Sequence, residues 1–251
     1  MVMRLIKLRR SLAGGFVVAL VAIQPARAQQ VPSPLRYEVR AWPDAAILTG
    51  AAAATLVPRL LKGSLPHATC APCDPSGLWR IDRGAVGPLR SAPARVSDVL
   101  VLGTTLGGAV LLATTRSGEG GDARREDFAV LTEAVGLTSA ATDWMKVLFH
   151  RPRPVRYSAD ALDYPSANNG LSFPSGHTSQ AFAAAAAYAS ILHRRGVAGR
   201  HRTDIAALFT PAAATGVMRV LSRKHFPTAV IAGALLGTAI GWTIPALHAI
   251  R

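Results

Sequence analysis

Charged, acidic and aromatic residues are all scarce in this sequence of 251 residues. Only 17% of the residues are charged and 6% are aromatic, and Asp plus Glu number 14 against 28 Lys plus Arg. The net charge of +14 suits an anionic partner, which could be a nucleic acid, a lipid or a small substrate. We find no Arg-rich recognition helix and no run of aromatic residues for base stacking. Nucleic acid is therefore not expected as a partner.

The sequence also lacks the period-2 pattern of β-strands, and no internal repeat stands out. Its two cysteines, Cys70 and Cys73, lie in the segment CAPC. A redox role of the thioredoxin type would need a βαβ context, which is missing, and two thiols alone do not make a zinc site. A local disulfide in an oxidising compartment is the preferred interpretation, with two inert thiols as the alternative.

What the sequence does contain is a large apolar fraction, since half of its residues are hydrophobic. Apolar runs between Pro- and Gly-marked loops predict an all-α bundle of about six helices. The expected helices are 44–61, 97–115, 126–149, 178–193, 204–221 and 227–250. Residues 178–192 and 228–247 carry no charge, as in helices buried in a large core or in lipid, whereas Pro58 and Arg59 interrupt the first helix. We expect a membrane-embedded bundle. The alternative interpretation is a wholly soluble periplasmic helical protein.

The first 28 residues have the pattern of a targeting segment. Four basic residues up to Arg10 precede an apolar run from Ser11 to Ile23, and residues 26–28 read Ala-Arg-Ala. The segment is a signal peptide or, if it is not cleaved, a signal anchor. The chain then divides into residues 1–28, an extension over 29–96 with the first helix and the CAPC loop, and a helical domain over 97–251.

Three short blocks carry the side chains that a phosphate-handling site needs. They are residues 146–154 (KVLFHRPRP), 174–177 (PSGH) and 219–225 (RVLSRKH). Catalysis of phosphoryl transfer depends mainly on positioning and on positive charge. Lys146 and Arg153 are seven residues apart, so a continuous helix would place both on one face, and the prolines at 152 and 154 would then end it. Arg153 offers bidentate hydrogen bonds and Lys146 a point charge.

The second block is typical of a helix start that binds an anion. Ser175 and Thr178 are N-cap signals, Gly176 lets the backbone approach a ligand closely, and the first helical N–H groups are free. His177 would lie at the mouth of this site, where a leaving oxygen needs a proton from a general acid. The simpler alternative is a capped helix with a surface histidine.

The third block supplies a further cation, Arg219, and a histidine, His225, that could attack phosphorus. A nucleophilic histidine needs an acceptor on its other ring nitrogen to fix its tautomer. The position one helical turn later could provide one, but it is Ala229. Asp143 and the Thr228 hydroxyl are possible substitutes, although Asp143 is expected to pair with Lys146.

The three blocks together resemble the type 2 phosphatidic acid phosphatase (PAP2) superfamily, which includes bacterial acid phosphatases and vanadium haloperoxidases. The family pattern is K-x6-RP, then PSGH, then SR-x5-H-x3-D, and the order and spacing match from Lys146 to position 229. The resemblance implies that His225 is the nucleophile and His177 the general acid. It also implies that phosphate is held by Lys146, Arg153, Ser175, Gly176 and Arg219.

Two positions depart from this family pattern. Met218 stands where the family usually has Ser, and Ala229 replaces the Asp that orients the nucleophile. Loss of the orienting carboxylate lowers the rate of a serine protease about 10⁴-fold, so a similar loss here would leave weak catalysis. The resemblance implies no metal and no cofactor, although vanadate or phosphate could occupy the site. Among the other histidines, His150 is the candidate for a role in the site, because it lies inside the first block.

These observations predict a metal-independent phosphatase that hydrolyses a phosphate monoester or pyrophosphate. We expect a lipid to carry this group and Ala229 to impair the activity. A soluble periplasmic acid phosphatase, a pseudoenzyme that binds phosphate or phospholipid, and a haloperoxidase are the alternatives. The link at 193–202 carries four Arg, which favours the cytoplasm and places the three blocks on the periplasmic side of a bacterial inner membrane. This agrees with an exported N-terminus if the first helix does not cross the membrane, and the side inverts if it does. The sequence does not indicate an oligomeric state.

Overall fold

The computed structural model describes residues 36–61, 70–115, 121–164 and 170–250. The chain divides into two compact units, Met1–Pro32 and Ser33–Arg251. The first unit, and with it the predicted targeting segment at 1–28, lies outside the described residues.

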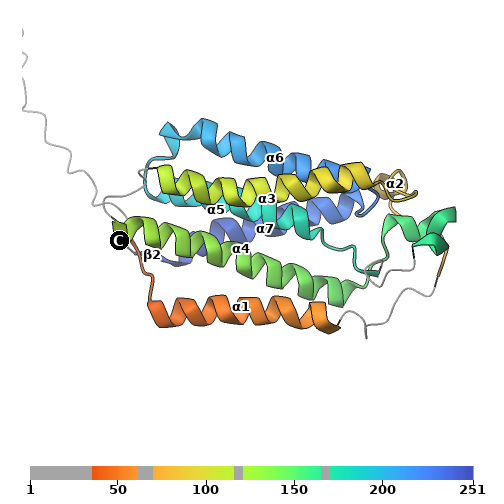
Figure 1. The fold of residues 1–251 in the computed structure, drawn as a ribbon, viewed down its shortest axis with the longest axis horizontal. Coiled ribbons are helices and arrows are strands. Elements are labelled where there is room, and N and C mark those ends of the chain that lie inside the picture. Colours follow the sequence, from red (N-terminus) through yellow and green to blue (C-terminus); the bar gives the residue numbers. More distant parts are fainter. Residues whose placement is uncertain (1–35, 62–69, 116–120, 165–169, 251) are drawn as a thin grey trace, which may run out of the picture. The chain divides into compact units, whose positions relative to one another are not determined.

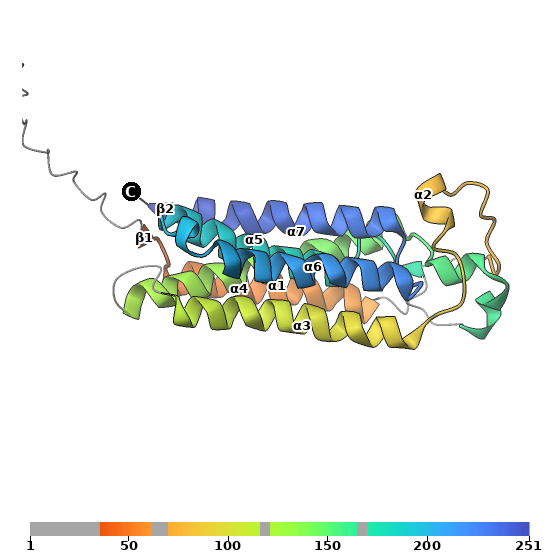
Figure 2. The same ribbon diagram turned by 90° about the horizontal axis from the view of Figure 1, so that it is seen from above.

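Among the described residues, six long helices and one short helix form most of the second unit (Figures 1 and 2). They are α1 (Ala41–Leu61), α2 (Arg80–Arg83), α3 (Ser91–Thr114), α4 (Gly121–Phe149), α5 (Gly176–Arg194), α6 (Arg202–Leu221) and α7 (Pro227–Leu247). Three 3₁₀ helices lie in the described parts of the connections: η1 (Pro154–Tyr157), η2 (Ala159–Asp163) and η4 (Ala198–Arg200). The prediction of an all-α bundle is confirmed.

Several element boundaries differ from the predicted ones. Helices α3 and α4 begin at Ser91 and Gly121, earlier than expected. Helix α7 ends at Leu247, because Ala249–Ile250 forms strand β2, which pairs antiparallel with β1 (Arg36–Tyr37). The predicted interruption of α1 by Pro58 and Arg59 is wrong, since the helix continues to Leu61. A proline this close to a helix end disturbs few backbone hydrogen bonds.

The division into an N-terminal extension over 29–96 and a helical domain over 97–251 stays a prediction from the sequence. The boundary between residues 96 and 97 falls inside α3. Helix α1 packs along α4 and belongs to the same bundle (Figure 1).

Helix α5 lies at the centre of the bundle and contacts α3, α4, α6 and α7. Most of its residues are buried, including the alanines from Ala183 to Ala187. Small side chains on every face let neighbouring helices approach α5 closely. Helix α7 comes nearest, because its glycines Gly233, Gly237 and Gly241 face backbone atoms of α5.

Within the described ranges, four helices are long and apolar enough to cross a membrane, namely α1, α3, α6 and α7. They carry large hydrophobic side chains that remain exposed in the bundle, such as Leu60, Val99, Leu102, Leu235 and Trp242. Exposed apolar surface of this extent indicates contact with lipid. The prediction of a membrane-embedded bundle is therefore confirmed by the composition and exposure of these helices.

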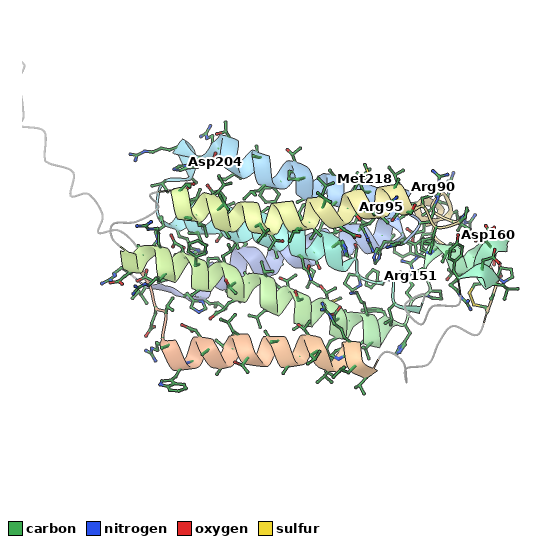
Figure 3. All side chains as sticks on the ribbon, in the orientation of Figure 1. Arg90, Arg95, Arg151, Asp160, Asp204 and Met218 are labelled. Atoms are coloured by element: carbon green, nitrogen blue, oxygen red, sulfur yellow. A yellow bond between two sulfur atoms is a disulfide. The ribbon has the colours of Figure 1, made fainter. Side chains whose placement is uncertain are left out.

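The two ends of the bundle are named here after residues labelled in Figure 3. At the Arg151 end, α1, α4 and α6 finish and α3, α5 and α7 begin, and Arg95 and Met218 lie toward it (Figure 3). At the Asp204 end the directions are reversed. There, buried Arg195 pairs with Asp127 at 2.8 Å and so joins α5 to α4.

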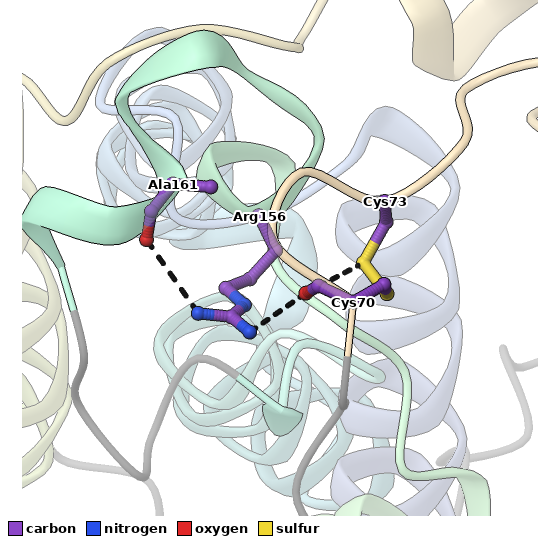
Figure 4. The surroundings of a disulfide bond; sticks show 4 residues. All are labelled: Cys70, Cys73, Arg156 and Ala161. Atoms are coloured by element: carbon purple, nitrogen blue, oxygen red, sulfur yellow. Dashed lines mark hydrogen bonds between the residues drawn. A yellow bond between two sulfur atoms is a disulfide. The ribbon is translucent and has the colours of Figure 1, made fainter.

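A disulfide lies in the loops at the Arg151 end (Figure 4). It joins Cys70 to Cys73, and Arg156 holds it in place by donating from Nη2 to the Cys70 carbonyl at 2.7 Å. In return, the Cys73 N–H donates to the Arg156 carbonyl at 2.7 Å. The disulfide loop is thereby attached to η1, which follows directly after Arg153.

Candidate active site

The three sequence blocks meet at the Arg151 end of the bundle. Lys146 lies in the last turn of α4, Arg219 in the last turn of α6 and His177 in the first turn of α5. Because successive helices run in opposite directions, helix ends that are far apart in the sequence become neighbours here. A cavity of about 290 Å³ opens between α1, α4 and α5. Four of the predicted site residues line it, namely Lys146, Arg153, Gly176 and His177.

Lys146 is held in the cavity by a carboxylate on its own helix. Its Nζ donates to Asp143 Oδ1 at 2.7 Å, which confirms the expected pairing of these two residues. The other oxygen of Asp143 accepts from Arg59 Nε of α1 at 2.8 Å. Asp143 is therefore occupied by two cations and does not serve His225.

Arg153 reaches the cavity from outside α4, so the expectation of one helical face shared with Lys146 is wrong. Helix α4 ends at Phe149, and His150 has a left-handed backbone conformation (φ 42°). Arg151 and Arg153 both precede a proline, which disfavours helical backbone. Arg153 Nε is buried without a hydrogen-bond partner among the described residues, and burial lowers the pKa of Arg153 to about 10. A guanidinium in this state is suited to binding an anion.

Asp98, near the start of α3, connects the general-acid candidate to a cation. Its Oδ1 lies 2.7 Å from His177 Nε2 and accepts from Arg219 Nη1 at 3.4 Å. The same Nη1 also donates to the Ser97 hydroxyl at 3.2 Å. The sequence did not single out Asp98, because it is an isolated acid in an apolar helix far from the three blocks. Its position fixes the imidazole of His177 at the cavity.

The start of α5 forms one wall of the site. Ser175 takes the N-cap position, but its hydroxyl pairs with the Thr178 hydroxyl at 2.9 Å instead of capping a backbone N–H. A Cβ on Gly176 would lie 3.0 Å from Lys146 Nζ, so glycine allows the ammonium group to approach the first turn. The free N–H groups of this turn and the adjacent ammonium are suited to phosphate oxygens.

His225 is buried between α6 and α7, and one ring nitrogen is fixed. Its Nδ1 lies 2.7 Å from the Ser172 carbonyl oxygen, which can only accept a hydrogen bond. Nδ1 therefore carries the proton, and Nε2 carries the lone pair. Burial, together with the positive charges of Arg219 and Arg153, holds the pKa of His225 well below its usual value. The imidazole is consequently neutral at neutral pH, with Nε2 unprotonated.

Comparison with known families now identifies the group to which the protein belongs. Residues 128–251 match the family model of the PAP2 superfamily. The chain belongs to the PAP2 superfamily. Neither the curated proteins nor the solved structures gave a match. Membership of the PAP2 superfamily indicates phosphatase activity on phosphate esters.

Ala229, which departs from the PAP2 pattern, lies in apolar surroundings. Ala229 is fully buried and packs with Leu78, Ala85 and Phe226. Its carbonyl accepts from the Ser175 N–H at 2.9 Å, which joins the start of α7 to the start of α5. No acceptor for His225 is therefore found on this side chain.

The Thr228 hydroxyl does not replace the PAP2 carboxylate either. It donates to Asp82 Oδ2 at 2.7 Å, and its backbone N–H donates to Asp82 Oδ1 at 3.0 Å. Asp82 belongs to α2 and lies outside the residues that match the PAP2 model. Nothing in its sequence position connects Asp82 with the third block.

Two further features of this PAP2 bundle bear on bound ions. His150 does not line the 290 Å³ cavity, and its Nε2 is buried without a hydrogen-bond partner among the described residues. Asp44, Glu133 and His248 have ligand atoms within 4.8 Å of one another, so these three residues could hold a cation. They lie at the Asp204 end, away from the phosphate-binding candidates.

Proposed function

We propose that this PAP2 protein hydrolyses a phosphate monoester or pyrophosphate through a phospho-histidine intermediate at His225. The observation that carries the proposal is the hydrogen bond from His225 Nδ1 to the Ser172 carbonyl. It leaves the Nε2 lone pair available beside the positive charges of Arg219, Arg153 and Lys146. Attack on an anionic phosphoryl group requires a neutral nucleophile and nearby positive charges.

In the first step, His225 Nε2 forms a bond to phosphorus while the bond from phosphorus to the leaving oxygen breaks. Protonated His177, whose Nε2–H bonds to Asp98, donates its Nδ1 proton to that oxygen and becomes neutral, so the leaving group departs as a neutral alcohol or as a phosphate. Lys146, Arg153, Arg219 and the first N–H groups of α5 stabilise the charge on the equatorial oxygens. Asp98 keeps the His177 ring oriented toward the substrate.

In the second step, water attacks phosphorus and breaks the bond to His225 Nε2. The neutral His177 takes the proton from the water, which restores it for the next cycle. Inorganic phosphate leaves, and His225 returns to its starting tautomer. Each step uses side chains of the protein alone, and the proposal needs no metal or cofactor at this site, although vanadate could bind there in place of phosphate.

Ala229 limits the rate in this proposal without abolishing turnover. A backbone carbonyl orients His225 as an aspartate would, but it stabilises developing positive charge on the ring less than a carboxylate does. The alternative is a PAP2 pseudoenzyme that binds phosphate or phospholipid without turnover. The observation that favours this alternative is the apolar packing around Ala229.

We propose a lipid phosphate as the substrate. Helix α1 contributes Pro58 and Arg59 to the cavity, and the neighbouring Leu56 and Leu60 point outward. A phosphate group at the depth of lipid headgroups would therefore meet the cavity while its acyl chains stay among apolar side chains. A soluble acid phosphatase is disfavoured by the four apolar helices.

We further propose that the Arg151 end faces the periplasm. The disulfide at this end suits an oxidising compartment, and the Arg-rich link at 193–202 lies at the opposite end, as expected for a cytoplasmic loop. Helix α1 is itself long enough to cross the membrane. If it does, counting membrane spans from an exported N-terminus does not place the Arg151 end in the periplasm. The assignment rests on the two loops.

The proposal is tested by trapping the intermediate. The protein, purified in detergent, is incubated with a ³²P-labelled phosphomonoester and with a labelled lipid phosphate, then quenched in alkali. We expect an acid-labile, alkali-stable phosphoenzyme and steady release of phosphate from the wild type, and neither from His225→Ala. Turnover that survives this substitution would rule out His225 as the nucleophile. Binding of phosphate without any turnover by the wild type would establish the pseudoenzyme instead.

A further inference from the structure

The hydrogen-bond acceptor that orients His225 is the carbonyl of Ser172, which lies in a loop. The position of this carbonyl therefore depends on the hydrogen bonds that hold Ser172 in place. Ser172 is fully buried, and its N–H donates to the Arg151 carbonyl at 2.9 Å. Its hydroxyl donates to the Pro152 carbonyl at 3.0 Å. The position of the acceptor is therefore set by the segment 151–152, which has left the helical path after Phe149.

The side chain of Arg151 fixes that segment to the helix that carries the nucleophile. Arg151 Nη1 donates to the Thr228 hydroxyl at 2.7 Å, in the first turn of α7. The guanidinium carbon also lies 4.3 Å from the ring centre of Phe226, the residue next to His225. The acceptor segment and the start of α7 are thus joined through one guanidinium group.

Asp82 holds this arrangement together from a third segment. Its Oδ2 accepts from Arg151 Nη2 at 2.7 Å and from the Thr228 hydroxyl at 2.7 Å. Its Oδ1 accepts from the Thr228 N–H at 3.0 Å, at the positive end of the α7 helix dipole. The Asp82 side chain is 1% exposed, and every oxygen has a partner. A carboxylate that binds both the acceptor segment and the nucleophile helix controls their separation.

We propose that Asp82 is a positioning residue for the nucleophile and does the work that PAP2 proteins assign to the carboxylate at position 229. It acts on His225 through Arg151 and the Ser172 carbonyl, without touching the imidazole. The same segment closes the gap left by the missing side chain, because Leu78 and Ala85 on either side of Asp82 pack against Ala229. This inference rests on the proposed role of His225.

The test compares Asp82→Asn with Asp74→Asn, an exposed aspartate of the loop before α2 whose carboxylate bonds only to Ser76 among the described residues. We expect Asp82→Asn to lower kcat about 10- to 100-fold, the range typical for groups that orient a functional histidine from behind. The Kd for inorganic phosphate should change little, because the cations of the cavity are intact, whereas the melting temperature should fall, because Arg151 loses its buried charged partner. Asp74→Asn should match the wild type in all three measurements.

Two further measurements test whether Asp82 and Arg151 act together and whether Asp82 sets the tautomer of His225. Combining Asp82→Asn with Arg151→Lys should lower kcat no further than the larger single effect, since both act through one chain of contacts. The ¹⁵N spectrum of His225, assigned by its loss in His225→Gln, should show the Nδ1–H tautomer in the wild type and a mixture in Asp82→Asn. The spectrum does not depend on turnover, so an inactive wild type would contradict the proposed function while the tautomer still tests Asp82.

An unchanged kcat with an unchanged tautomer in Asp82→Asn would overturn the inference. So would a parallel fall of kcat, phosphate affinity and melting temperature, because that pattern indicates a general structural role. If Asp82→Asn does not fold, Arg151→Lys alone decides the question. It keeps the positive charge opposite Asp82, loses the fork that reaches Thr228, and should show the same separation of kcat from phosphate affinity.

Discussion

At the scale of single residues, the surroundings of position 229 decide whether a carboxylate can be restored there. In Ala229→Asp, the new charge would be buried among Leu78, Ala85 and Phe226. We expect a loss of stability of about 1–3 kcal/mol, the cost of an unsatisfied buried polar group, and no gain in phosphate release. Thermal unfolding and turnover of the purified variant measure the two effects.

Ala229→Ser is the matched control, since it adds a small polar atom without a charge. We expect it to keep most of the wild-type stability and turnover. A rise in turnover of a hundredfold or more in Ala229→Asp would show that the carboxylate reaches His225, and that the Ser172 carbonyl is a poor substitute.

The buried imidazole of His225 also predicts a pH dependence. Burial and the charges of Arg219 and Arg153 lower its pKa well below 6.5, so the neutral, nucleophilic form persists as the pH falls through that value. The acid limb of kcat/KM should therefore lie below pH 6.5, once the separately measured ionisation of the substrate has been divided out.

Removing one of these charges should move the acid limb in a known direction. In Arg153→Gln the pKa of His225 should rise, and the acid limb should shift to higher pH in addition to the loss of phosphate affinity. An acid limb that stays in place would indicate that it reports another group.

Sequence reasoning worked best for residues whose identity carries the information. Lys146, Arg153, His177 and His225 could be named from the spacing of the blocks, and the structure brings them to one end of the bundle. Ser172 could not be found in this way, because its contribution is a backbone carbonyl that any residue possesses. Asp82 contacts Arg151 at a distance of 69 positions in the sequence and Asp98 contacts His177 at 79, and local spacing contains no signal for such contacts.

At the scale of helices, the contact between α5 and α7 places both histidines. Helix α5 begins beside His177 and α7 begins beside His225, and the two helices touch through Gly237 and the Ser179 carbonyl. A methyl group in Gly237→Ala would overlap that oxygen. We expect a loss of about 1–3 kcal/mol in stability, as for overpacking, and a fall in turnover because the helix starts separate.

Gly103→Ala provides the matched control for this prediction. Gly103 is also inside a long helix, but a Cβ there meets nothing within 4 Å. Its melting temperature should stay unchanged or rise slightly, since alanine favours helix by roughly 0.5–1 kcal/mol over glycine. Equal effects of the two substitutions would show that the α5–α7 contact tolerates a side chain.

The helices themselves could be predicted from apolar runs, and their ends less well. The first turn of α4 could not be predicted, because it carries charged residues such as Asp122 and Arg125 and the apolar pattern begins only after them. The two-residue ladder between Arg36–Tyr37 and Ala249–Ile250 is too short for a period-2 pattern. It depends on α1, α4 and α7 bringing both segments to the Asp204 end.

At the scale of the whole molecule, the positive charge of the chain suits anionic groups, whereas the apolar surface of the bundle suits the membrane interior. Lys and Arg gather in the loops and at the helix ends, where phosphate or lipid headgroups would lie. The exposed leucines and valines of α1, α3 and α7 occupy the lengths between. This division explains how a strongly basic chain can also contain four helices that suit a membrane.

The proposed opening of the cavity to the periplasm rests on the loops at the two ends of the bundle, and it can be measured. In a background of Cys70→Ser and Cys73→Ser, Ser76→Cys marks the Arg151 end and Gly199→Cys the Asp204 end, both at exposed positions. A membrane-impermeant maleimide added to intact spheroplasts should label Ser76→Cys and spare Gly199→Cys, which should react only after permeabilisation. The reverse pattern would place the phosphate-binding residues in the cytoplasm. The Cys70–Cys73 disulfide would then lie in a reducing compartment, and the substrate would have to be sought in the inner leaflet.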